Sequence, residues 1–152
     1  MCIQTVSVFA LMFTLWFYYR QIVLMRLQLD ETKRGATAEN VISLIGYLQA
    51  DDVREARTFV ITKLRDKDID NWSEEEKYMA SKICSSYASA AVVLQTKFIP
   101  LQPFIENWGP SVQICYKILE AFIQDLRKSE NAGPNYWKPF DWLYQQTIEA
   151  KL

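Results

Sequence analysis

The chain has 152 residues, half of them hydrophobic and 14% aromatic, and its 17 basic and 18 acidic side chains give a net charge of −1. This composition excludes a disordered protein, and the balanced charge lacks the basic excess of a nucleic-acid binder. The chain has only four glycines and five prolines. Because these helix breakers are scarce and the apolar spacing is helical throughout, we expect an all-α protein.

The first nineteen residues, Met1 to Tyr19, carry no charged side chain. As a helix they would extend about 28 Å, close to the ~30 Å hydrocarbon thickness of a bilayer. No basic residue precedes the segment and bulky aromatic residues end it, which argues against a cleaved secretory signal. We therefore predict a transmembrane-type helix, with an amphipathic or oligomer-buried helix as the alternative.

Basic residues follow the uncharged stretch Met1 to Tyr19, beginning with Arg20, Arg26 and Lys33. By the positive-inside rule, the side that carries them faces the cytoplasm. The sequence therefore predicts a single-pass protein of the cell inner membrane with a cytoplasmic C-terminal domain.

A polar stripe runs along the predicted membrane helix at spacings of three and four residues, which place its members on one face. In lipid such groups are best satisfied by partner helices or a water-filled lumen. The stripe predicts a pore-lining or helix-association face in a homo-oligomer such as a tetramer; alternatively, its hydroxyls bond only to their own backbone. Its members are Gln4, Ser7, Leu11, Thr14 and Tyr18.

The apolar helix is expected to continue past Arg20 and to end at Gly35. This end divides the chain into a membrane helix with its extension, 1–34, and a small cytosolic helical bundle, 35–152. Thr37 is a suitable N-cap for the first bundle helix. After a break at 50–52, Asp52 and Glu55 form the pattern of a capping box.

The remaining helices are marked by caps and prolines. Ser73 with Glu76 predicts a second capping box at the start of a long helix. Pro110 suits the first position of a helix that runs to about Lys128. After a break at 131–134, the aromatic residues of 136–144 are expected to dock the C-terminal helix onto the bundle.

Short motifs along the chain carry a resemblance to a known family: EAR at 55–57, WSEEE at 72–76, WGP at 108–110, Arg127 at a helix end, and YWKPFDWL at 136–143. Over roughly residues 40 to 145 the chain resembles a family of small helical bacterial and phage proteins of unknown function. Members often begin with a single membrane helix. The resemblance implies fold and topology, and it transfers no catalytic residue.

The predicted architecture is also similar to the membrane effector subunit of the Hailong anti-phage defence system. Such effectors are oligomeric ion channels that open in response to a nucleic-acid-like signal made by a partner nucleotidyltransferase. The similarity implies an oligonucleotide or nucleotide second messenger as the ligand.

The chain is poor in catalytic groups. It has no histidine, and its cysteines, Cys2, Cys84 and Cys115, are too far apart in sequence for a short metal-binding motif. Cys84 and Cys115 are expected to be reduced core thiols. No glycine-rich phosphate loop occurs. We therefore expect neither an enzyme nor a bound metal or cofactor.

Basic residues offer the one candidate ligand site in the predicted bundle. Guanidinium groups suit phosphate recognition, so an anionic signal is expected to bind here. The alternative is a solvated face of mixed charge, because acidic residues lie nearby in the sequence. The candidate residues are Arg54, Arg57, Lys63, Arg127 and Lys128.

Taken together, these features predict a membrane effector that forms a homo-oligomeric pore or ion channel in the lipid bilayer. Its cytosolic domain would sense the signal and shift the assembly toward the open state. A membrane-anchored, non-catalytic interaction module is the alternative, and a soluble helical enzyme is a third possibility.

Overall fold

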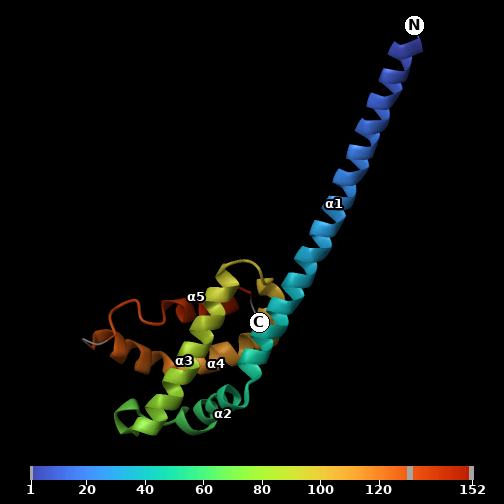
Figure 1. The fold of residues 1–152 in the computed structure, drawn as a ribbon. Coiled ribbons are helices and arrows are strands. Elements are labelled where there is room, and N and C mark those ends of the chain that lie inside the picture. The colour runs from blue at the N-terminus through green and yellow to red at the C-terminus, as the bar shows by residue number, and fades with distance from the viewer. Residues whose placement is uncertain (1, 130–131, 151–152) are drawn as a thin grey trace. The chain divides into compact units, whose positions relative to one another are not determined.

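The computed structural model describes residues 2–129 and 132–150, except the side chains of residues 2–11 and of Arg34. Within these ranges the chain is helical and has no strand, so the all-α prediction is confirmed. The chain divides into two compact units, Met1–Glu39 and Asn40–Leu152. The elements, labelled in Figure 1, are α1 (Cys2–Gln49), α2 (Asp51–Phe59), the π-helix η1 (Val60–Leu64), the 3-10 helix η2 (Ile69–Asn71), α3 (Glu74–Gln95), α4 (Leu101–Lys128) and α5 (Lys138–Glu149).

The expected helix end at Gly35 is wrong, because α1 continues through this residue. A glycine inside a helix costs roughly 1 kcal/mol relative to alanine, which good helix formers on both sides can offset. Thr37 does not cap a new helix either. Its hydroxyl donates to the Lys33 carbonyl at 2.9 Å, one turn back along the same helix.

The predicted membrane span, Met1 to Tyr19, falls largely on residues 1–11, which lie outside the described side chains. Among the residues that the structure describes, no helix combines the length and the apolar character needed to cross a bilayer.

The start of α2 also differs from the prediction. Ala50 occupies the N-cap position without a side-chain bond, so the expected capping box of Asp52 and Glu55 is wrong. Asp52 instead lies in the first turn and pairs with Lys82 of α3 at 2.8 Å. The hydrogen bond from Lys82 lowers the pKa of Asp52. This carboxylate therefore connects two helices rather than capping one.

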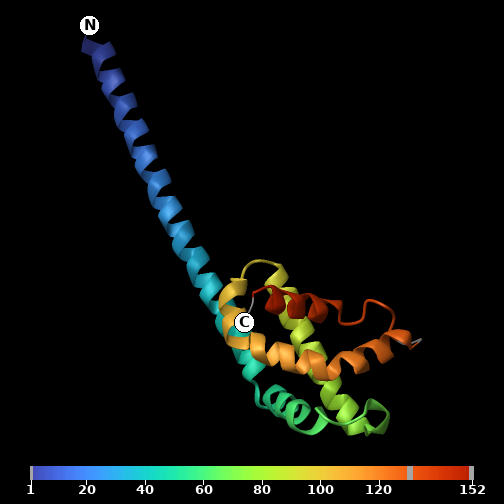
Figure 2. The ribbon, with the colours of Figure 1, turned by 180° about the vertical axis from the view of Figure 1, so that it is seen from behind.

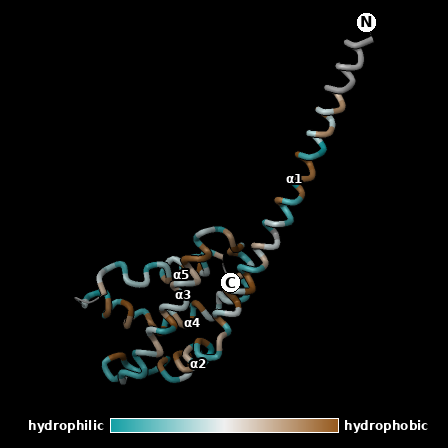
Figure 3. The backbone as a smooth tube through the Cα atoms, viewed as in Figure 1, coloured by the Kyte–Doolittle hydropathy of each residue, from teal (hydrophilic) through white to brown (hydrophobic). Residues whose placement is uncertain are grey.

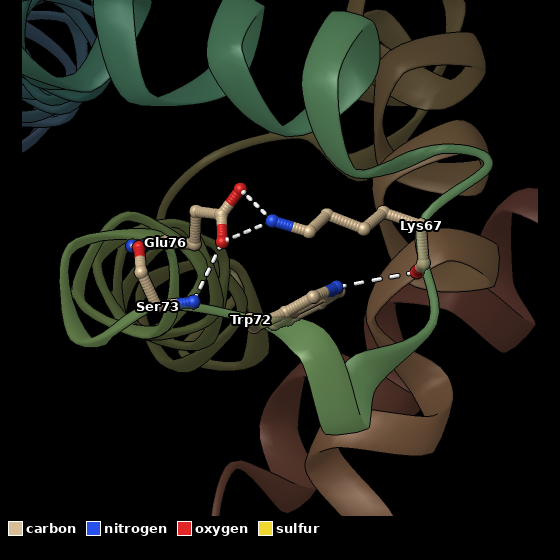
Figure 4. Close-up of polar contacts among 4 residues, drawn as sticks. All are labelled: Lys67, Trp72, Ser73 and Glu76. Atoms are coloured by element: carbon tan, nitrogen blue, oxygen red, sulfur yellow. Dashed lines mark hydrogen bonds and ion pairs between the residues drawn. The ribbon is translucent and has the colours of Figure 1, made fainter.

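The capping box at the start of α3 is confirmed (Figure 4). The Ser73 hydroxyl accepts a hydrogen bond from the Glu76 amide at 3.3 Å, and the Glu76 carboxylate accepts one from the Ser73 amide at 2.6 Å. Lys67 lies 2.7 Å from both carboxylate oxygens of Glu76, and its carbonyl accepts from the Trp72 indole at 3.2 Å. The loop before α3 is thus held at both of its ends.

Helix α4 begins earlier than expected, because Pro110 lies inside it and not at its first position. A proline inside a helix clashes with the Cβ of the residue before it and with the carbonyl one turn back, and it lacks the amide hydrogen of the helical hydrogen bond. Gly109 removes only the first of these costs, because it has no Cβ. Pro103 stands in the first turn, where a missing amide hydrogen costs little. The helix nevertheless runs from Leu101 to Lys128.

The core of unit 40–152 forms where α3 and α4 pack against α5 (Figures 1 and 2), and α2 packs against α3. Figure 3 shows apolar and polar residues interleaved along these helices, as expected for helices with one buried side. Phe140 and Leu143 of α5 are fully buried. The Phe140 ring lies 5.2 Å from the rings of both Tyr87 and Tyr116. The predicted aromatic docking of the C-terminal helix is therefore confirmed.

A polar contact reinforces this docking at the end of α4. Arg127 donates to the Tyr136 carbonyl and to the Asp141 carboxylate, both at 2.8 Å. Tyr116 donates to the other oxygen of Asp141 at 3.0 Å. Burial, followed by this hydrogen bond to a carboxylate, raises the pKa of Tyr116. Arg127 therefore holds α5 and the loop before it against α4.

The contacts of Glu76 give a pH-dependent stability. The hydrogen bond from Lys67, followed by that from the Ser73 amide, lowers the pKa of Glu76 below 4.5. Since the folded-state pKa is depressed, this stabilisation is complete above the unfolded value and is lost as the pH falls through the folded one. Glu76→Gln should therefore lower the Tm at about pH 7, and its difference from the wild type should shrink toward about pH 3. Glu75→Gln, in the same turn, is the control. A Tm difference independent of pH would contradict this role.

Replacing Arg127 should loosen α5. Arg127→Met leaves the partly buried Asp141 without its cation and should cost about 2 kcal/mol in the free energy of unfolding. Lys128→Met, at the exposed neighbouring position, should change it by less than about 0.5 kcal/mol. Urea denaturation measures both variants, and equal effects would show that the ion pair does not hold the helix.

Candidate functional site

Exposed apolar side chains cover α1 from Met12 to Leu29, a stretch we call the apolar segment. Thirteen large hydrophobic side chains within it are between 39% and 68% exposed. The segment includes Trp16, whose ring lies 5.6 Å from the guanidinium of Arg20. Water-soluble monomers rarely leave so large a continuous apolar surface uncovered. The apolar segment is therefore a candidate contact surface.

The apolar segment has no side that is wholly polar. The consecutive residues Leu15 to Tyr19 are all large and at least half exposed, and five residues exceed one helical turn of about 3.6. A helix that lies flat on a bilayer or pairs in a two-stranded coiled coil needs only one apolar stripe. A helix that is apolar all round is typical of burial on every side.

The predicted polar stripe is described only in part. Thr14 and Tyr18 are exposed and lie one turn apart, and Gln21 follows on the same face. The side chains of the other three predicted members fall outside the described residues; they are Gln4, Ser7 and Leu11.

The structure separates the five basic residues proposed as a ligand site. Arg54 and Lys63 lie along a shallow, open surface of α2 and η1, together with the acidic residues Asp51 and Glu55. Arg54 pairs with Asp51 at 2.8 Å, and both side chains are largely exposed. This surface has the mixed charge of a solvated face, where ion pairs contribute little.

Arg127 and Lys128 lie in the last turn of α4 and do not line this surface. Arg127 is engaged by Asp141 and the Tyr136 carbonyl, as described above. Lys128 is exposed on the last turn of α4, where a cation favours the helix dipole. The part that Arg127 plays in the fold is thus structural.

Arg57 differs from the other four, because it lines a cavity of about 680 Å³. The cavity is formed by the C-terminal end of α1, by α2, by the connection before α4 and by the first half of α4. Its walls are mainly apolar and include Leu44, Ile99 and Phe104. The Arg57 guanidinium lies 4.7 Å from the centre of the Trp108 ring. Cavities of this size and character are common ligand sites.

Polar groups gather beside Arg57. Ser111, in the cavity wall, shares a 2.8 Å hydrogen bond with the hydroxyl of Tyr87. Burial raises the pKa of Tyr87 and raises that of Cys115 to about 11, while the positive charge of Arg57 opposes both shifts. The cavity therefore combines apolar walls with one cation and a buried hydroxyl pair.

The cysteines fit the predicted core role. Cys84 and Cys115 are free thiols and fully buried, and burial raises the pKa of each. A thiol held protonated in this way is a poor nucleophile. In the described part of the chain, no three or more acidic, cysteine or histidine side chains are grouped closely enough to hold a metal ion.

The sequence prediction missed this cavity. A signal was present in α2, where Arg57 follows the buried Val53 by one turn and adjoins the buried Ala56, so that a cation borders the apolar face. Its partner Trp108 is far away in sequence, and only the fold brings the two together.

Comparison with known proteins identifies the family. Neither a curated protein nor a solved structure matches the chain. The model of a family described as a domain of unknown function, DUF4760, matches residues 2–147. The match extends beyond the predicted range of 40 to 145 and includes all of α1. The predicted membership of a family of unknown function is confirmed: the chain belongs to the DUF4760 family.

Proposed function

We propose that this protein is a membrane effector. The apolar segment and the residues before it insert into the lipid bilayer as part of a homo-oligomer, and unit 40–152 senses a signal that controls the assembly. The proposal includes leakage of ions through the assembly, with the face of Thr14 and Tyr18 directed toward the lumen.

The observation that carries the proposal is the run of five large, exposed side chains from Leu15 to Tyr19, which face every side of α1, with the Tyr18 hydroxyl on the proposed lumen face. Lipid covers a helix on all sides, whereas a two-stranded coiled coil leaves the outer faces in water. Arg20 and Arg26 lie within the apolar segment, so insertion requires their long side chains to extend along the helix to the headgroup region.

The family match adds a second support, because it includes α1 together with the bundle. The N-terminal helix is thus part of the family domain, as expected if the helix and bundle act together. The anti-phage role and the nucleotide signal rest on the similarity to the Hailong effector and stay predictions.

If the apolar segment inserts into the membrane, charged substitutions within it should release the protein from the membrane. Leu15→Glu with Leu24→Glu should move the protein from the membrane to the soluble fraction, since each buried charge costs several kcal/mol (about 3). Phe98→Glu changes an apolar side chain of unit 40–152 that is 68% exposed, and it is the matched control. Flotation of cell membranes after a carbonate wash measures the distribution. A wild-type protein recovered as a soluble monomer would rule out both the effector and the anchored module.

If the protein forms a pore, the depolarisation that it causes should depend on the side chain at residue 14. Expression of the wild type should depolarise bacterial cells, as read with a voltage-sensitive dye. Thr14→Leu should reduce the rate of depolarisation at least about tenfold, because it removes a hydroxyl from the proposed lumen. Thr32→Leu, an exposed threonine on the same helix outside the apolar segment, should have no effect. Membrane attachment with no depolarisation by the wild type would leave the anchored interaction module as the function.

A further inference from the structure

The cavity at Arg57 contains a cation with spare hydrogen-bonding capacity. One guanidinium nitrogen donates to the Leu48 carbonyl at 3.2 Å, the Arg57 side chain also hydrogen-bonds with Tyr87, and the guanidinium lies over the Trp108 ring. A guanidinium has five N–H donors. Among the ion pairs found within residues 2–129 and 132–150, none involves Arg57. A half-buried guanidinium with no carboxylate partner favours an anion supplied from outside.

The residues that line the cavity indicate the kind of molecule to which the anionic group belongs. Leu44, Ile99 and Phe104 are buried residues of the lining, and Ile45 is 37% exposed beside them. These side chains offer no hydrogen bonds. Because only Gln49, Asn107 and Ser111 add polar side chains to the lining beside Arg57, a polar body such as a sugar would recover only part of the hydrogen bonds to water that it loses on entering. An aliphatic or aromatic body loses none and gains about 25 cal/mol for each Å² of apolar surface buried.

The single positive charge of Arg57 indicates which anionic group the ligand carries. One guanidinium matches the single charge of a carboxylate, and its planar fork can donate two parallel hydrogen bonds to the two oxygens. A terminal nucleotide phosphate carries more charge, and Arg57 is the sole cationic residue in the described lining. A phosphodiester carries only one charge, but the sugar and base attached to it would lose hydrogen bonds to water against the mainly apolar walls. The volume of about 680 Å³ lies within the usual range for small-molecule sites.

We propose that this cavity binds an amphipathic monocarboxylate, such as a medium-chain fatty acid. Its carboxylate pairs with Arg57, and its apolar chain lies against Leu44, Ile99 and Phe104. The inference is independent of membrane insertion, because every lining residue belongs to unit 40–152. It also names a ligand class for the bundle that the proposed function leaves open.

Photo-crosslinking in the full-length protein tests the site. The probe is decanoate with a diazirine at its far end, added to protein reconstituted in phosphatidylcholine nanodiscs, and peptide mapping by mass spectrometry locates the label. We expect labelling of the peptides that carry Ile99 and Phe104. Excess decanoate should remove at least about 90% of the label, and decan-1-ol should remove far less because it cannot form the charged pair.

Two arginines of one helix provide a matched comparison. Arg57→Met should reduce labelling of the cavity peptides at least about tenfold, whereas Arg54→Met, outside the cavity, should leave it unchanged. If Arg57→Met does not fold, Ile45→Trp serves instead, because it fills the cavity from a partly exposed position and should also prevent labelling. Equal labelling of wild type and Arg57→Met, equal competition by decan-1-ol, or label confined to the apolar segment would each overturn the proposal. Label confined to the apolar segment would leave the membrane proposal intact.

Discussion

The apolar segment imposes the constraint on which this account depends. Removing a large apolar side chain from water is worth roughly 1.5–3 kcal/mol, and thirteen such side chains between Met12 and Leu29 are substantially exposed. Covering them would release on the order of 10 kcal/mol, comparable to the whole stability of an average domain. The proposed membrane insertion would cover this surface, and the large side chains of Leu15 to Tyr19 face every side of the helix.

The same helix supplies residues to both parts of the molecule. α1 carries the apolar segment, and its C-terminal end places Leu44 and Leu48 in the core of unit 40–152. Leu44 also lines the cavity at Arg57. A ligand in that cavity would therefore touch the C-terminal end of α1.

The sequence predicted those features of the fold whose interacting residues are close together in the chain. The capping box of Ser73 and Glu76 could be predicted because both partners lie within one turn. Gly35 and Pro110 misled the prediction, since each normally breaks a helix, yet α1 and α4 continue through them. In α4 part of the reason is local, because Gly109 has no Cβ to clash with Pro110.

The candidate site was less predictable than the fold. The prediction grouped the basic residues of 54–63 with Arg127 and Lys128, but Arg54 and Arg127 have carboxylate partners and only Arg57 lines the cavity. That cavity depends on Trp108 and Ile99, which reach Arg57 through the packing of helices far apart in sequence. The residue pattern of α2 alone therefore could not predict the cavity.

Spin-label depth measurements along α1 would show whether the apolar segment enters the bilayer. In a Cys2→Ser background, labels at Phe13, Phe17 and Leu24 would be compared with a label at Phe98 in protein bound to bilayers. Insertion predicts that the labels in the apolar segment are more accessible to oxygen than to a water-soluble nickel complex, and that the order reverses at Phe98. Preferential accessibility of all four labels to the nickel complex would contradict insertion of α1 and, with it, the membrane effector.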